Sequence, residues 1–181
     1  MIDGTVRYRH LPIGKRQSKL LKYTICFIKR GNDILMLNRK SAPEMGVWNG
    51  VGGKLEPGEP PLEGVLREVY EETGIELETA TEKGTVTWQA DEQDNGGMYA
   101  YLAEVPENFT YVTPKATDEG ILDWKPLDWL LHSENQGVAE HVKRFLPIML
   151  RDDRLFDFQC TYDEDGRLVD CRPVPLIRIF V

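Results

Sequence analysis

The segment from residue 41 to residue 74 constrains the fold most, because it places a long loop directly before a helix pattern. Loops of this length are uncommon in compact domains and usually carry function. Pro60 and Pro61 suit the first turn of a helix, and Gly74 is placed to end it. We therefore predict a glycine- and proline-rich loop over residues 41–58, followed by an amphipathic helix that packs on a core. The apolar residues that recur at helical spacing are Leu62, Val65, Leu66 and Val69.

Three carboxylates gather on one face of this predicted helix, because Glu68, Glu71 and Glu72 stand at i, i+3 and i+4. Like charges at this spacing cost about 0.2–0.5 kcal/mol per pair. Either the face is simply solvated, or its hard oxygen ligands bind a divalent cation. The preceding Gly52-Gly53 pair allows close backbone approach and favours the second interpretation. Mg²⁺ commonly keeps water and substrate phosphates among its ligands, so a phosphorylated substrate is expected.

The rest of the chain predicts an α+β fold, a mixed sheet sandwiched by helices. A closing hairpin is expected to turn at Asp165-Gly166, which places Cys160 opposite Cys171. A disulfide or two reduced thiols would fit that pairing, and reduced thiols are expected in a cytosolic protein. The expected strands are residues 23–29, 34–39, 75–81, 84–90, 98–105 and 121–127, with a helical turn at 128–132, a second helix at 138–151 and the hairpin over 154–174.

Length and charge indicate one compact domain at residues 23–181 with a basic N-terminal extension at residues 1–22. The 181 residues carry a net charge of −8, although the extension holds six Lys or Arg and one acid. The acidic body argues against binding of duplex nucleic acid. The extension either contacts a polyanion or is a solvated, loosely packed tail. Without a long apolar run or a secretory leader, we expect a cytoplasmic protein that has no membrane partner.

The loop and helix resemble the Nudix box, GX5EX7REUXEEXGU, at every fixed position. The matching residues are Gly53, Glu59, Arg67, Glu68, Val69, Glu71, Glu72, Gly74 and Ile75. The resemblance extends from about residue 23 to residue 174 and implies a hydrolase that cleaves a diphosphate linkage with Mg²⁺ or Mn²⁺. It assigns metal binding to Glu68, Glu71, Glu72 and the Gly53 carbonyl, and makes Glu68 a candidate base. Arg67 and Glu59 are expected to brace the loop.

Three candidate residues lie outside the fixed positions of the box. Glu119 matches the position of an extra metal-binding or base carboxylate in many Nudix hydrolases, although a surface turn residue is equally expected there and Asp118 is its rival. Lys54 and Arg39 lie close to the box and are candidates for phosphate binding. For Arg39 and its neighbour Lys40, a solvated side chain is the favoured interpretation.

The flanks of the box resemble the 8-oxo-dGTP diphosphatases of the Nudix family. In "VWNGVGGK", Asn49 matches a residue that hydrogen-bonds the purine base, and Tyr23-Thr24 match the floor of the base pocket. The chain departs from that pattern before the second helix, where "VAEHVKR" replaces a pair of acids. Glu140 and His141 are candidates to replace them, but a surface histidine is the expected role of His141.

These features predict hydrolysis of an oxidised purine nucleoside triphosphate, such as 8-oxo-dGTP, to the monophosphate and pyrophosphate. Two alternatives stay open. One is a Nudix pyrophosphatase for a nucleotide sugar or dinucleoside polyphosphate, and the other is a Nudix domain that senses nucleotides without cleaving them. The expected partner is a small nucleotide, and both a monomer and a homodimer are compatible with the sequence.

Overall fold

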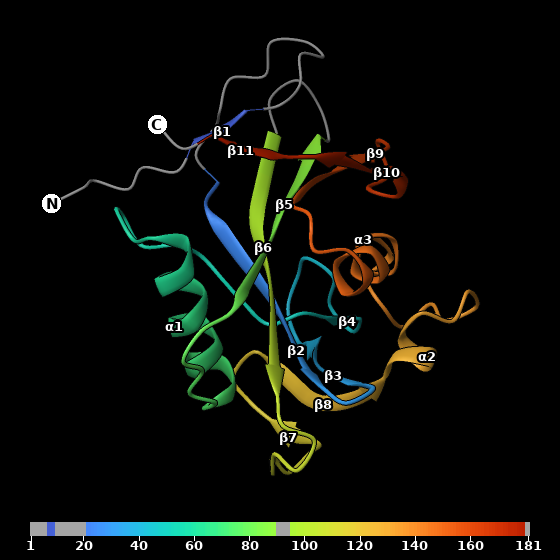
Figure 1. Ribbon diagram of the computed structural model, residues 1–181. Coiled ribbons are helices and arrows are strands. Elements are labelled where there is room, and N and C mark those ends of the chain that lie inside the picture. The colour runs from blue at the N-terminus through green and yellow to red at the C-terminus, as the bar shows by residue number, and fades with distance from the viewer. Residues whose placement is uncertain (1–6, 10–20, 90–94, 180–181) are drawn as a thin grey trace, which may run out of the picture.

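A computed structural model describes residues 7–9, 21–89 and 95–179, and shows a mixed sheet between helices (Figure 1). Helix α1 (Pro61–Thr73) covers one face of the sheet and helix α3 (Glu140–Arg151) covers the other. The short helix α2 (Leu127–Leu130) follows the strand β8. This arrangement confirms the predicted α+β class.

The main sheet has nine strands within the described residues, in the order β10-β9-β5-β6-β2-β3-β8-β7, with β4 paired to β3. Two neighbouring pairs, β2 with β6 and β5 with β9, are parallel, whereas the other pairs are antiparallel. The strands are β2 (Tyr23–Arg30), β3 (Asp33–Arg39), β4 (Trp48–Asn49), β5 (Thr81–Gln89), β6 (Asn95–Val105), β7 (Lys115–Ala116), β8 (Gly120–Pro126), β9 (Phe156–Tyr162) and β10 (Leu168–Pro175).

Strand β2 connects both halves of the core, because its side chains alternate between the two faces of the sheet. Ile25 and Phe27 pack in the core layer under α3, whereas Cys26 and Ile28 pack in the layer under α1. All four are buried, which explains why the strand reads as a continuous apolar run. The two helices are thus held at fixed positions on either side of one central strand.

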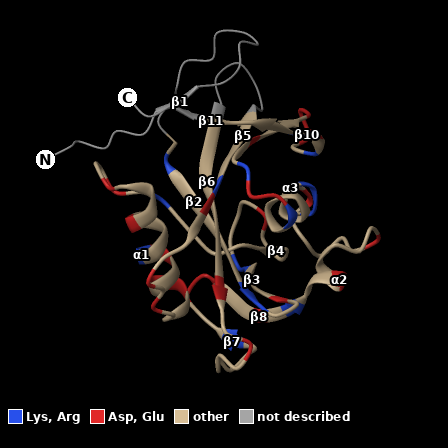
Figure 2. Ribbon diagram, viewed as in Figure 1, with Lys and Arg blue, Asp and Glu red and all other residues tan. Residues whose placement is uncertain are grey.

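The first helix begins and ends as the sequence predicts. Pro61 is its first residue, and Gly74 follows its end with φ 76°, a left-handed conformation that costs glycine little. Val65 and Val69 are fully buried, but Leu62 lies at the rim and is 39% exposed. The polar side of α1 carries a run of acidic residues (Figure 2).

Five local predictions need correction. Residues 75–80 are not a strand, and Ile75 and Ala80 instead pack beneath α1 without pairing their backbones. The predicted loop contains the short strand β4. Helix α3 begins at Glu140, and α2 begins at Leu127. The turn does contain Asp165 and Gly166, but its predicted length of two residues is wrong, because residues 163–167 join β9 to β10 and a bulge follows between Leu168 and Asp170.

Both ends of the described chain meet in a separate two-stranded sheet. Strand β1 (Arg7–Arg9) pairs antiparallel with β11 (Ile177–Ile179). Residues 1–6 and 10–20 of the predicted loosely packed tail lie outside the described residues, as does residue 90 of the predicted strand. No helix in the described part of the chain is long and apolar enough to cross a membrane.

We expect truncation of an apolar helix side chain to lower stability more at a buried position than at the rim of the core. Leu146 of α3 is fully buried, so Leu146→Ala should lower the free energy of unfolding by about 2–5 kcal/mol. Leu62→Ala, at the 39% exposed rim position of α1, is the matched control and should cost clearly less. Urea denaturation of both variants measures the difference. Equal losses would contradict this assignment of core and rim.

Candidate active site

The second half of the glycine loop is fixed to the sheet by backbone hydrogen bonds. Val51 exchanges two with Cys26 of β2, at 2.7 and 3.1 Å, and the Thr24 N–H donates to the Gly53 carbonyl at 2.8 Å. Gly52 adopts φ 144°, and a Cβ at this position would collide with the Thr24 carbonyl. Only glycine therefore allows the loop to approach β2 so closely.

Gly53 brings the loop against the first acidic residue of the helix. A Cβ on Gly53 would collide with the Glu68 carboxylate, so that carboxylate lies directly against the loop backbone. The Gly53 carbonyl accepts one hydrogen bond, from Thr24. A carbonyl oxygen has two lone pairs, and the second remains available to a cation.

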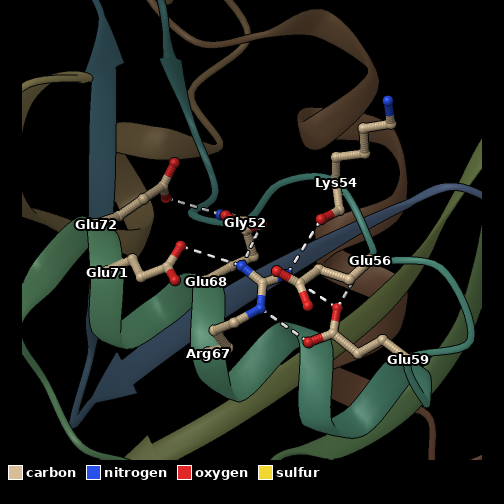
Figure 3. Close-up of polar contacts among 8 residues, drawn as sticks. All are labelled: Gly52, Lys54, Glu56, Glu59, Arg67, Glu68, Glu71 and Glu72. Atoms are coloured by element: carbon tan, nitrogen blue, oxygen red, sulfur yellow. Dashed lines mark hydrogen bonds and ion pairs between the residues drawn. The ribbon is translucent and has the colours of Figure 1, made fainter.

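Arg67 connects the loop to three of the acids (Figure 3). Its Nε and one terminal nitrogen donate to the two carboxylate oxygens of Glu59, at 2.8 and 2.9 Å. The other terminal nitrogen donates to Glu68 at 2.9 Å and to Glu71 at 3.1 Å. A further contact of 3.2 Å reaches the Lys54 carbonyl. The contacts of Arg67 and Glu59 are those of residues that brace the loop.

Hydrogen bonds from Arg67 lower the pKa of Glu59 to about 2, helped by the Glu56 N–H. Glu68 behaves differently, because burial raises its pKa and Arg67 only partly opposes that effect. Arg67 therefore keeps Glu59 ionised, whereas the ionised form of Glu68 remains unfavourable. Glu71 is exposed at the outer edge of the group.

Glu72 accepts a hydrogen bond of 2.9 Å from the Gly52 N–H, which fixes its carboxylate at the loop (Figure 3). Burial raises its pKa to about 7, despite that hydrogen bond, and the charges of Glu68 and Glu119 raise it further. Arg39 opposes this shift. The influence of Glu119 and Arg39 places both near Glu72, although sequence separates them widely.

The donor set fits a hard divalent cation, since these groups are carboxylate and carbonyl oxygens. Burial makes the ionised forms of Glu68 and Glu72 costly, and a cation between them would stabilise that charge. Within the described residues, no three acidic, histidine or cysteine side chains converge closely enough to hold an ion. Glu68 and Glu71, which now face Arg67, would have to rotate to join Glu72 around one ion.

The predicted base-binding residue Asn49 is 9% exposed and its amide is already engaged. Its Oδ1 accepts from the Gly50 N–H at 2.8 Å, and its Nδ2 donates to Glu44 at 2.6 Å. The other oxygen of Glu44 lies 3.3 Å from Nδ1 of His141. Glu44 therefore bridges the loop to α3. It has φ 63°, the only positive φ among the described residues that are not glycine.

The expectation of a surface histidine is wrong, because His141 is only 7% exposed. Its ring stacks on Phe145, with ring centroids 5.7 Å apart, and its Nδ1 also lies 3.4 Å from the Tyr162 hydroxyl. Burial lowers its pKa, and its Nε2 has no hydrogen-bond partner. Glu140 is exposed and faces Arg144 at 3.5 Å. Glu44 could not be identified from the sequence, because the loop in which it lies has no periodic pattern.

The remaining predicted residues surround these two groups of side chains. Tyr23 is 42% exposed and bridges to Lys54 through the backbone, whereas Thr24 is buried and its Oγ1 has no partner. Lys54 is exposed. The Arg39 guanidinium donates to the Pro43 carbonyl at 3.0 Å, so it is not simply a solvated side chain.

Comparison with known proteins identifies the protein family. A family model for the NUDIX domain matches residues 20–147, so this chain belongs to the Nudix family. Nudix hydrolases act on pyrophosphate bonds and generally use a divalent metal such as Mg²⁺.

Individual relatives are distant. The chain is 27% identical to uncharacterized Nudix hydrolase YvcI of Bacillus subtilis, over 86% of this chain and 96% of that protein. It is 28% identical to the oxidized purine nucleoside triphosphate hydrolase of Danio rerio, over 78% of this chain and 85% of that protein. Among solved structures, a MutT protein from Bacillus halodurans has a TM-score of 0.67 at 29% identity, covering 85% of this chain and 97% of that one.

The raised pKa of Glu72 predicts how stability depends on pH in the absence of metal. Its folded pKa is about 7 and its ordinary value is 4.5, so the folded state binds more protons between these values. The contribution of Glu72 to the free energy of unfolding should therefore decrease as pH rises from about 4.5 to about 7. Urea denaturation in chelator measures this, with Glu72→Gln lacking that decrease and Glu63→Gln, an exposed acid on the same helix, as the charge control. Parallel pH curves for wild type and Glu72→Gln would contradict the prediction.

Proposed function

We propose that this protein hydrolyses a purine nucleoside triphosphate, with 8-oxo-dGTP as the first candidate, to the monophosphate and pyrophosphate. The observation that carries the proposal is the position of Glu68 and Glu72. Both carboxylates lie against the glycine loop, where burial disfavours their charge unless a cation accompanies them. In this role the protein would remove oxidised nucleotides from the cytoplasmic pool before they enter DNA.

The residues proposed to hold Mg²⁺ or Mn²⁺ are Glu68, Glu71, Glu72 and the Gly53 carbonyl, with Glu119 as an additional carboxylate. Such a cation polarises a phosphoryl oxygen, activates water and stabilises the leaving pyrophosphate. Arg67 positions Glu68 and ties the helix to the loop. Glu68 is proposed to accept a proton from water, and Glu72 is its rival for that role, because both carboxylates lie against the loop backbone.

Binding of the nucleotide is proposed for residues that flank the acids and the loop. Lys54 is exposed and free to meet phosphate, and Arg39 lies close enough to Glu72 to influence its charge. Asn49, with Thr24 and Tyr23 beside it, is proposed to contact the base. The similarity to the Danio rerio enzyme, which spans most of both chains, supports an oxidised purine as the substrate.

Glu44 offers an acid where the acid pair before the second helix is absent. Its carboxylate already accepts a hydrogen bond from Asn49 at 2.6 Å. A purine edge that carries N–H donors could replace that contact, because a carboxylate accepts several hydrogen bonds. We therefore propose Glu44 as the acid that reads the base together with Asn49.

A panel of nucleotides tests the reaction. Wild-type protein with Mg²⁺ should release pyrophosphate from 8-oxo-dGTP, and Glu72→Gln should reduce kcat by about 10²- to 10³-fold, because the loss of one electrostatic contact to a transition state has an effect of that size. Circular dichroism should remain unchanged, because Glu72 lies off the apolar stripe of α1 and the glutamine oxygen can still accept the hydrogen bond from the Gly52 N–H. Glu63→Gln, on the exposed first turn of the same helix, should keep full activity.

Other outcomes decide between the alternatives. Preferred cleavage of nucleotide sugars or dinucleoside polyphosphates would replace the triphosphate with another diphosphate substrate. Saturable binding of nucleotides by a folded protein that turns none of them over would identify a sensor. Full activity of Glu72→Gln would show that the cation is held elsewhere.

Asn49→Ala should reduce discrimination among bases more than it reduces cleavage. The ratio of kcat/KM for 8-oxo-dGTP to that for dCTP should fall, while cleavage of dCTP changes little, because the variant removes contacts to the base and leaves the carboxylates intact. Asn38→Ala is the matched control, since the Asn38 amide donates to the Gly46 carbonyl and holds the same loop. Equal losses on all nucleotides would remove Asn49 from the base site.

A further inference from the structure

Two thiols face each other at the edge of the main sheet. Cys160 of β9 is the direct register partner of Cys171 of β10, and β10 has only β9 as a neighbour in the described sheet. Both cysteines are reduced, and their sulfur atoms lie 2.9 Å apart. A disulfide bond is about 2.05 Å long, so closing this pair needs only a small movement of side chains on an edge strand.

The two thiols differ in solvent exposure and in pKa. Cys160 is 3% exposed and belongs to the core layer under α3, whereas Cys171 is half-buried on the outer strand. The Cys160 thiol donates a hydrogen bond to Cys171, and this bond together with the charge of Arg144 lowers the pKa of Cys171. The same hydrogen bond and burial raise the pKa of Cys160. Cys171 is therefore the better nucleophile, with Cys160 beside it to form the second bond.

The third cysteine provides an internal reference. Cys26 is fully buried in the layer under α1, and burial raises its pKa to about 12. A thiol that is both inaccessible and protonated reacts slowly with oxidants. One chain thus contains a paired, accessible site and an isolated, inert one.

We propose that Cys171 and Cys160 form a hydroperoxide-reactive site that closes to an intramolecular disulfide. The Cys171 thiolate attacks the peroxide O–O bond, takes one oxygen as a sulfenic acid and, with a proton, releases an alcohol or water. The Cys160 thiol then attacks the Cys171 sulfur, the S–S bond forms, and the sulfenic oxygen leaves as water. The thiols lose two electrons and the peroxide gains them. This modification is independent of the proposed hydrolysis.

The position of the pair suits a reversible crosslink. Residues 163–167 join the two strands outside the core, and the bulge between Leu168 and Asp170 adjoins Cys171, so the hairpin can adjust. The bond would join edge strand β10 to β9, just before Tyr162, whose hydroxyl lies 3.4 Å from His141. A reductant of the thiol class would reopen it by exchange.

Mass spectrometry tests the proposal on the full chain. Reduced protein is treated with one equivalent of hydrogen peroxide, quenched in acid, alkylated in denaturant and digested. The expected product carries alkyl label only on Cys26, contains a peptide pair joined through Cys160 and Cys171, and returns to three labelled cysteines after dithiothreitol. Three labelled cysteines after peroxide, or disulfides between separate chains, would overturn the proposal.

Single substitutions separate the roles of the cysteines. Cys26→Ser should form the same crosslink, whereas Cys160→Ser should accumulate a sulfenic acid on Cys171 that dimedone traps. Cys171→Ser should leave Cys160 reduced under the same dose. Oxidation of Cys160 in that variant as fast as in wild type would overturn the assignment of Cys171 as the attacking thiol. If Cys160→Ser does not fold, the wild-type peptide map still decides the crosslink.

Discussion

The contact of Arg67 with the acids around it is the interaction on which the candidate site depends. A planar guanidinium has five N–H donors in a fixed geometry, and here they reach three carboxylates and one backbone carbonyl. Lysine could not make these contacts together. Because Glu59 takes two of the donors, it is strongly ionised, and Glu68 receives too little stabilisation to offset its burial. Arg67 therefore assembles the acids without neutralising them.

The acids of the site differ in how fully their charges are neutralised, and this difference separates acids that stabilise the loop from acids that could bind a cation. Glu59 is satisfied by Arg67 and by the Glu56 N–H, so it stabilises the loop. Glu72 has one backbone N–H as its partner and the charges of Glu68 and Glu119 nearby. Its charge is tolerated only near and above neutral pH unless a cation is present. The loop before α1 thus carries the first kind of acid, and α1 itself carries the second.

Sequence predicted the parts of the fold that local chemistry determines. Pro61 and Gly74 bound α1 as expected, because each acts through its own backbone preference. The strand predicted at residues 75–81 failed because alternating Ile75 and Leu77 resemble a strand, although they pack beneath α1. The hairpin turn failed because the bulge near Asp170 shifts the register. The pairing of Cys160 with Cys171 was still predicted correctly, because the register shift lies between these residues and the turn.

The candidate site was predictable on one side only. The acids of α1 stand at fixed spacing on one helix, so sequence places them together. Glu44, Asn49 and His141 come from a loop, a two-residue strand and a distant helix, and no local rule brings them into contact. The positive φ of Glu44 and the unpartnered Nε2 of His141 appear only in three dimensions.

The loop between Asn49 and the acids of α1 is supported by one strand, β2. The Thr24 N–H of β2 holds Gly53, and Cys26 on the same strand holds Val51, so the loop backbone that follows Asn49 is fixed to β2. A base bound at Asn49 would thereby set the distance of its phosphates from Glu68 and Glu72. The Glu44–Asn49 hydrogen bond occupies the amide in the free protein. If Asn49 and Glu44 bind the base as proposed, the ligand would have to offer Asn49 an acceptor and Glu44 a donor, as a purine edge with adjacent acceptor and donor atoms would.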